Sequence, residues 1–196
     1  MFAGRKDAVG YRFSKETIVQ DTLDMGFTHA ALVDVSTLVA REEVRDMCAV
    51  DKCHGYNKNW SCPPGCGTIP ECQERMRSYD WGVITQITLD MEDAMDMEAW
   101  TEAGKKLHDG QVKLNAELHK VYSDVLALGG AGCNICKECT YPDAPCRFPE
   151  KRMSGMEAYG LVVSDVCMKN GLKYYYGPDT VTFSGMFLVK DNGGRP

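Results

Sequence analysis

Cysteine is the residue type through which this chain can do chemistry, and nine of its ten cysteines fall into two groups. The first group lies between residues 48 and 72 and the second between residues 133 and 146. Their members are Cys48, Cys53, Cys62, Cys66 and Cys72 in the first group, and Cys133, Cys136, Cys139 and Cys146 in the second. Thiolates bind zinc and iron-sulfur clusters, so this clustering predicts two metal-binding modules, at residues 48–72 and 133–149.

The second group has the denser spacing. Cys133, Cys136 and Cys139 lie three residues apart, and Cys146 follows with Pro149 just beyond it. A zinc ion usually takes its four ligands as two separated pairs, whereas three thiols in one short run resemble the Cys-x2-Cys-x2-Cys run of 4Fe-4S ferredoxins. We therefore expect these four cysteines to bind a 4Fe-4S cluster, with structural zinc as the alternative. In ferredoxins with two clusters, the fourth cysteine of the run serves the other cluster, which leaves the place of Cys146 open.

The first group is looser and has one thiol more than a cluster needs. We expect four of these thiols to bind a second 4Fe-4S cluster, namely Cys48, Cys53, Cys62 and Cys66. Cys66 shares a short loop with Cys62, whereas Cys72 follows Pro70 and is expected on a helix as a core thiol. Cys72 is therefore the reserve choice for the fourth ligand.

Other residues near the cysteines have several possible roles. His54 adjoins Cys53 and could replace a thiolate, although a solvent-facing histidine is the simpler expectation. Positive side chains beside the predicted ligands would favour a reduced cluster and could meet an acidic partner, with a solvated rim as the alternative. These side chains are Lys52, Lys58, Lys137 and Arg147. The separate Cys167 fits the buried face of a helix and is expected in the core.

Composition excludes several classes of protein. The chain has 196 residues, of which 44% are hydrophobic and 26% charged, as in a compact globular protein. The formal charge of -6 opposes the binding of nucleic acid or anionic lipid by bulk electrostatics. No apolar run approaches the ~20 residues that cross a bilayer, and residues 1–7 do not resemble a secretion signal. We expect a cytoplasmic protein, where clustered cysteines indicate metal or redox chemistry rather than disulfides.

Regular elements surround the two modules. We expect helices near residues 14–25, 38–47, 69–79, 92–128 and 154–170, strands near 29–35 and 81–89, and a final hairpin of residues 174–176 and 181–189. Gly129 and Gly130 are expected to end the longest helix. This pattern predicts one α+β domain over residues 1–196, with a small, mostly antiparallel sheet, helices on one face, and both cysteine modules on loops.

Several segments together resemble one known family. They are Cys48-x4-Cys53, Trp60-Ser61-Cys62-Pro63-Pro64, Cys133-x2-Cys136-x2-Cys139, Cys146-Arg147-Phe148-Pro149 and Ser154-Gly155-Met156-Glu157-Ala158-Tyr159-Gly160. They resemble the bacterial and archaeal cysteine-rich predicted metal-binding proteins, a domain of unknown function. The resemblance covers roughly residues 40–190. It implies cysteine-bound metal in an anaerobe-type cytoplasmic protein, with iron-sulfur as the expected form.

Three functional hypotheses follow from the cysteines. The leading one is an iron-sulfur protein that binds two 4Fe-4S clusters and exchanges single electrons with a redox partner protein. The second is an enzyme in which the first cluster has only three cysteine ligands and exposes an iron to substrate as a Lewis acid. The third is a structural zinc protein whose thiolates hold loops together. Nucleotide-binding glycine motifs are absent from the sequence, so nucleotide chemistry receives no support.

Overall fold

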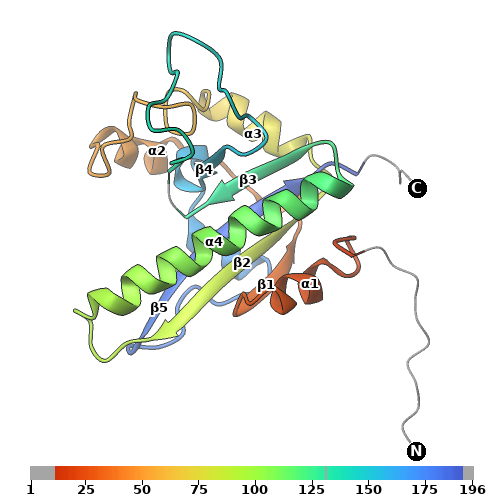
Figure 1. The fold of residues 1–196 in the computed structure, drawn as a ribbon, viewed down its shortest axis with the longest axis vertical. Coiled ribbons are helices and arrows are strands. Elements are labelled where there is room, and N and C mark those ends of the chain that lie inside the picture. The colour runs from red at the N-terminus through yellow and green to blue at the C-terminus, as the bar shows by residue number, and fades with distance from the viewer. Residues whose placement is uncertain (1–11, 131, 192–196) are drawn as a thin grey trace, which may run out of the picture.

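A computed structural model describes residues 12–130 and 132–191 (Figure 1). Residues 1–7, on which the expectation about export depends, lie outside the described residues. Within the described part of the chain, no helix is long and apolar enough to cross a membrane.

A five-stranded sheet forms the centre of the fold and confirms the predicted α+β class. In spatial order its strands are β1 (His29–Val33), β2 (Trp81–Asp90), β5 (Thr180–Val189), β3 (Val125–Gly129) and β4 (Met153–Gly155). The long strands β2 and β5 pair in antiparallel register over their whole length, from Trp81 opposite Val189 to Asp90 opposite Thr180. Among the strand pairings of residues 12–130 and 132–191, only that of β3 with β4 is parallel.

Helices cover both faces of the sheet, which corrects the expectation of helices on one face. Helices α1 (Ile18–Asp24) and α4 (Met97–Val121) pack on one face with Val83 and Phe187. Helices α3 (Ile69–Arg77) and α5 (Val163–Lys169) pack on the other with Ile84 and Met186. Neighbouring strand residues point to opposite faces, and all of residues 81–87 are buried, so the centre of the sheet has no solvated side.

Three predictions of secondary structure were wrong, and one reason explains all three. The long helix ends at Val121, and the next apolar residues form β3 instead of continuing it. Residues 174–176 form no strand, so β5 pairs with β2 and β3 rather than in a final hairpin. The predicted helix 154–170 divides into β4, the 3₁₀ turn η2 (Glu157–Tyr159) and α5. Short apolar runs fit helix and strand alike, and tertiary pairing decides between them.

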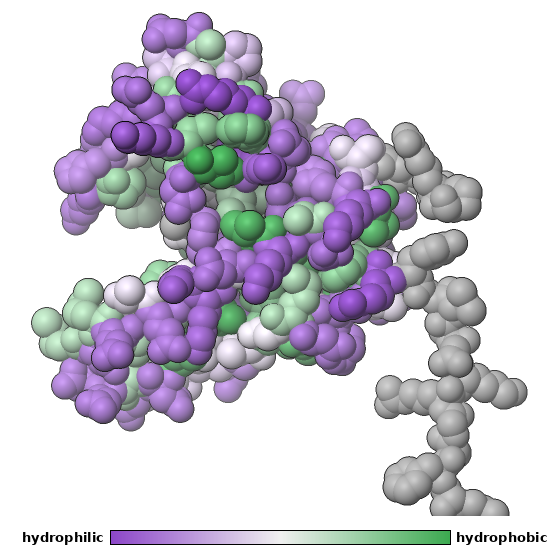
Figure 2. Space-filling model, in the orientation of Figure 1, coloured by the Kyte–Doolittle hydropathy of each residue, from purple (hydrophilic) through white to green (hydrophobic). Residues whose placement is uncertain are grey.

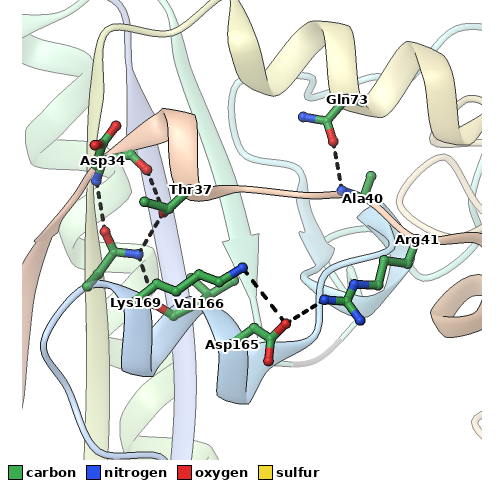
Figure 3. A network of polar contacts seen from close by, with 9 residues as sticks. Asp34, Thr37, Ala40, Arg41, Gln73, Asp165, Val166 and Lys169 are labelled. Carbon is green, nitrogen blue, oxygen red and sulfur yellow. Dashed lines mark hydrogen bonds and ion pairs between the residues drawn. The ribbon is translucent and has the colours of Figure 1, made fainter.

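Helix α2 (Glu42–Ala49), which carries Cys48, is held in place by the segment that precedes it. This segment follows the 3₁₀ turn η1 (Val35–Thr37). Figure 3 shows its polar contacts: Arg41 Nη2 lies 2.7 Å from the Asp165 carboxylate, and Ala40 N–H donates to Gln73 Oε1 at 2.7 Å. The start of α2 is thereby tied to both α5 and α3.

Both cysteine modules lie at one end of the molecule. The first connects α2 to α3, the second connects β3 to β4, and Figure 1 shows them near one another beyond the ends of β3 and β4. Helix α3 begins as predicted, because Thr68 forms a capping box with Glu71 and Pro70 lies in the first turn. In Figure 2 a notch in the outline separates the end of the molecule that carries both modules from the far end of α4 and β5. Hydrophilic residues cover much of the visible face of the end that carries the modules.

Candidate metal centre

The first module surrounds a cavity of about 530 Å³. Three of its predicted ligands, Cys48, Cys53 and Cys62, line the cavity. Cys133, which belongs to the second module, lines it as well. Glycines from the ends of β3 and β4 and the side chain of Glu157 complete this part of the wall. The folded chain therefore brings thiols of both modules to one space.

The backbone approaches the sulfurs of the first cavity closely. A Cβ atom placed on Gly55 would lie 2.9 Å from Cys62 Sγ and 3.8 Å from Cys53 Sγ. A Cβ atom on Gly132 would lie 3.8 Å from Cys62 Sγ. Glycine at these positions leaves room around the sulfurs that a side chain would fill. A soft donor set of thiols in such a cradle fits a thiolate-bound metal group.

The second module encloses a smaller cavity of about 30 Å³. All four predicted ligands of that module line it: Cys133, Cys136, Cys139 and Cys146. Trp60, Ile135 and Phe148 contribute apolar or aromatic surface to the same wall. An apolar shell around thiolates limits the access of water and thereby tunes a bound metal. Cys133 and Asn59 line both cavities, so the two spaces share a wall.

A buried serine joins the two modules. Ser61 is fully buried, and its Oγ accepts a hydrogen bond of 3.1 Å from the backbone N–H of Cys133. The Ser61 hydroxyl in turn donates to Asn59 Oδ1 at 2.7 Å. Because Cys133 lines both cavities, this hydroxyl fixes the residue at which they meet.

Aromatic residues make a second connection between the modules. Trp60 Nε1–H donates to the Ala144 carbonyl at 3.0 Å, and the Tyr141 hydroxyl donates to Asn57 Oδ1 at 2.9 Å. The rings of Trp60 and Tyr141 meet edge to face, with centroids 5.0 Å apart. These contacts cross between segments that are more than eighty residues apart in sequence. The two modules are therefore one structural unit.

Cys66 and Cys72 lie together and line neither of these cavities. Their exposed fractions are 2% and 0%. Arg45 Nη2 lies 3.5 Å from Cys66 Sγ and 3.2 Å from Cys72 Sγ. Cys72 is on α3 and in the core, as expected. The choice of Cys66 over Cys72 as a metal ligand stays a prediction, but the fold places Cys66 beside Cys72 rather than with Cys62 at the cavity.

Local electrostatics differ between these thiols. Desolvation raises the pKa of Cys48, and the nearby Glu157 carboxylate raises it further. Desolvation also raises the pKa of Glu157, although its side chain is accessible at the cavity wall. The Cys66 thiol and the Arg45 guanidinium lower the pKa of Cys72, whereas the pKa of Cys66 is raised by its bond to Cys72 and by burial. A bound metal cation would replace the protons on such thiols.

The loop around Cys53 is organised by Asp51. Its carboxylate accepts hydrogen bonds from Tyr56 N–H at 2.9 Å and from Lys58 Nζ at 3.1 Å, and both bonds lower its pKa. His54 is exposed, as the simpler expectation has it, and it also lines the first cavity; its role as a ligand stays a prediction. The positive side chains of Lys52, Lys58, Lys137 and Arg147 are all exposed near the modules.

Sequence reasoning assigned no role to three residues of this region. Ser61 and Arg45 act through hydrogen bonds to distant parts of the chain, and Glu157 reaches the first cavity from η2. No local spacing signals these roles, although Ser61 and Glu157 lie in segments that carry the family resemblance. Across residues 12–130 and 132–191, no group of three or more His, Cys, Asp and Glu side chains is gathered as a single-ion site. The separate Cys167 is fully buried, which confirms its expected place in the core.

Comparison with known proteins finds one family. The family described as predicted metal-binding protein (DUF2284) matches residues 31–189, a range that holds both modules and nearly the whole sheet. No curated protein and no solved structure matches the chain significantly. The match confirms the family expected from the sequence and its predicted metal-binding character, while the form of the metal stays a prediction.

Proposed function

Because the chain belongs to this family of predicted metal-binding proteins, we propose that it is an iron-sulfur protein that binds two 4Fe-4S clusters and transfers electrons to a redox partner. One observation carries the proposal: two cavities, each lined by three or more cysteines, share a wall at Cys133. Sites that adjoin in this way suit the passage of single electrons from one metal group to the next.

In the second cavity, Cys133, Cys136, Cys139 and Cys146 are the proposed ligands. When bound there, a 4Fe-4S cluster supplies a one-electron carrier. The chain contributes four thiolates, and Trp60, Ile135 and Phe148 exclude water from one side of the cavity. Solvent exposure and hydrogen bonds to the sulfurs are the means by which a protein sets the potential of such a group.

In the first cavity, Cys48, Cys53 and Cys62 are the proposed ligands. The sequence favours Cys66 as the fourth ligand, but its contacts with Arg45 and Cys72 favour a different role. The fourth position of this cavity then faces Cys133, His54 or Glu157, which also line it.

The redox partner is proposed to present an acidic surface. Lys52 and Lys58 are exposed beside the first cavity, and Lys137 and Arg147 beside the second. Positive side chains around both cavities attract an acidic partner and orient it toward the metal groups. These side chains are positive although the chain as a whole has a net charge of -6.

A cluster-dependent enzyme is the second candidate, and one observation favours it. The first cavity, at about 530 Å³, is within the range of roughly 300–1,000 Å³ that small-molecule sites occupy. It holds only three cysteines of its own module, which would leave one iron open to substrate. The raised pKa of Glu157 suits it to donate a proton in this cavity.

Single substitutions of one ligand in each cavity test the proposal. We expect Cys136→Ala and Cys53→Ala each to remove about half of the iron from protein purified without oxygen, since each affects one of two four-iron clusters. Cys167→Ala is the matched control, because Cys167 is buried and lines neither cavity, and it should retain the full iron content. Full iron in Cys136→Ala would remove the second cavity from the proposal.

Added cyanide separates the carrier from the enzyme. An iron with an open coordination position binds cyanide, which changes the electron paramagnetic resonance spectrum of that cluster. Unchanged spectra of both reduced clusters support a pure electron carrier. A change that is confined to one cluster, and that disappears in Cys53→Ala, supports the enzyme.

A further inference from the structure

The proposed ligand sets leave one pair of cysteines without a role. Cys66 and Cys72 are buried, and both contact the positively charged guanidinium of Arg45. We propose that Cys66 and Cys72 form a redox-active pair, a disulfide when oxidised and two thiols when reduced, that exchanges electrons with the metal group of the first cavity. This inference rests on the proposed function and adds a two-electron site to it.

The two sulfurs are placed to form a bond with each other. The Sγ atoms of Cys66 and Cys72 both contact the same nitrogen of Arg45, at 3.5 Å and 3.2 Å. Cys66 ends a short loop, and Cys72 lies in the first turns of α3 with its Sγ directed at the Cys66 carbonyl at 3.6 Å. A six-residue separation with such close approach is compatible with an intrachain disulfide.

Arg45 distinguishes this pair from an ordinary core thiol. Its guanidinium donates to the carbonyls of Gly67 and Ala158, which holds it over both sulfurs. A fixed positive charge stabilises a thiolate and makes it a better nucleophile for thiol and disulfide chemistry. Cys167, by contrast, has the uncharged partners Gln86 and Ser184. The environment of Cys66 and Cys72 is therefore that of reactive cysteines, although they are buried.

The pair adjoins the wall of the first cavity. Cys66 Sγ–H donates to the Ala158 carbonyl at 3.5 Å, and Ala158 lines that cavity. The backbone N–H of Cys66 donates at 3.0 Å to the carbonyl of Cys62, which is a proposed ligand there. Cys66 therefore contacts two residues that line the first cavity, Ala158 and Cys62. Burial excludes large reductants, so the cavity is the natural source of electrons.

The chemistry balances with the two proposed clusters as the electron source. The bond between the two sulfurs breaks as the disulfide takes up two electrons, one from each reduced cluster. Two protons from water that reaches the first cavity then complete the two thiols. Each cluster loses one electron, so two one-electron oxidations match one two-electron reduction. The pair would let a protein with one-electron carriers store or deliver electrons in twos.

Thiol counting tests the pair directly and does not depend on the metal. Holoprotein purified without oxygen is equilibrated with excess oxidised or reduced dithiothreitol, quenched in acid, unfolded, alkylated and analysed as peptides by mass spectrometry. We expect a cross-linked Cys66–Cys72 peptide after oxidation and two free thiols after reduction, with Cys167 free in both samples. If Cys66 and Cys72 stay free thiols under all conditions, the proposal is wrong.

A reductive titration tests the exchange of electrons. Oxidised wild-type protein should take up about four electrons per chain, two for the clusters and two for the disulfide. Cys66→Ser should take up about two electrons with full iron content, and the control Cys167→Ser about four. Uptake of only two electrons by the wild type, or loss of iron in Cys66→Ser or Cys72→Ser, would overturn the proposal.

The two proposals can fail separately. Zinc in place of iron would contradict the iron-sulfur proposal and, with it, the exchange of electrons with a cluster. Full iron together with unchanged thiols at Cys66 and Cys72 would contradict only the redox pair. The wild-type thiol count keeps this distinction even if a serine variant fails to fold.

Discussion

Replacement of Ser61 by alanine is expected to loosen the connection between the two metal-binding modules. The Ser61 side chain is fully buried, accepts a hydrogen bond from Cys133 N–H at 3.1 Å and donates one to Asn59 Oδ1 at 2.7 Å. Alanine keeps the backbone and the β-carbon but removes both bonds. Cys133 lines both cavities, so the loss acts where the two sites meet.

The magnitude follows from the two bonds that are lost. A backbone N–H that is left without an acceptor in a partly buried place costs about 1 to 3 kcal/mol. Asn59 Oδ1 loses only one of its two hydrogen bonds from residue 61, because it still accepts the bond from the backbone N–H at 3.0 Å. We expect Ser61→Ala to lower the free energy of unfolding by about 1 to 3 kcal/mol and to speed the release of iron.

Urea unfolding and iron release measure these two effects under anaerobic conditions. Ser78→Ala is the matched control, because the exposed Ser78 hydroxyl donates to a carbonyl within its own helix turn. The control should change the free energy of unfolding by no more than about 0.5 kcal/mol. An equally small change in Ser61→Ala, with unaltered iron release, would refute the idea that this hydroxyl joins the modules.

Two further substitutions test the first cavity and the stability of the scaffold. Gly55→Ala places a methyl group 2.9 Å from Cys62 Sγ, so we expect iron analysis to show about half the wild-type iron content. The control is Gly104→Ala on α4, where the nearest contact of the new methyl group is at 3.9 Å, and it should keep the full iron content. Burial alone would raise the pKa of Asp21, but the Phe13 N–H at 2.6 Å and Arg12 lower it overall. Its stabilisation is therefore present above its unfolded pKa of about 3.9 and is lost as the pH falls through the lower folded value. In urea unfolding, Asp21→Asn should thus be less stable than wild type near neutral pH and approach it below about pH 4, and a difference that is independent of pH would contradict this.

Local signals in the sequence predicted the parts of the fold that depend on local interactions. Thr68 and Pro70 mark the start of α3, and the apolar run that begins at Trp81 becomes β2. The four cysteines of the second module are close in sequence and line one cavity. Spacing along the chain was sufficient here because the interacting residues are neighbours in sequence.

Contacts between distant residues could not be predicted in this way. Cys133 is 72 residues from Ser61, and Cys66 is 92 residues from the Ala158 carbonyl that its thiol contacts. Loop length alone placed Cys66 with Cys62, whereas the packing of α2, α3 and η2 brings Arg45 and Cys72 to it. The local pattern of residues 125–129 fits the end of a helix, and it is the pairing with β5, far along the chain, that makes these residues a strand.

Analysis of iron, acid-labile sulfide and zinc in protein purified without oxygen tests the central claim most directly. Two thiol-lined cavities predict about eight irons and eight sulfides per chain, with dithionite-reducible spectra from both clusters. About one or two zinc ions per chain, with no sulfide, would contradict the account.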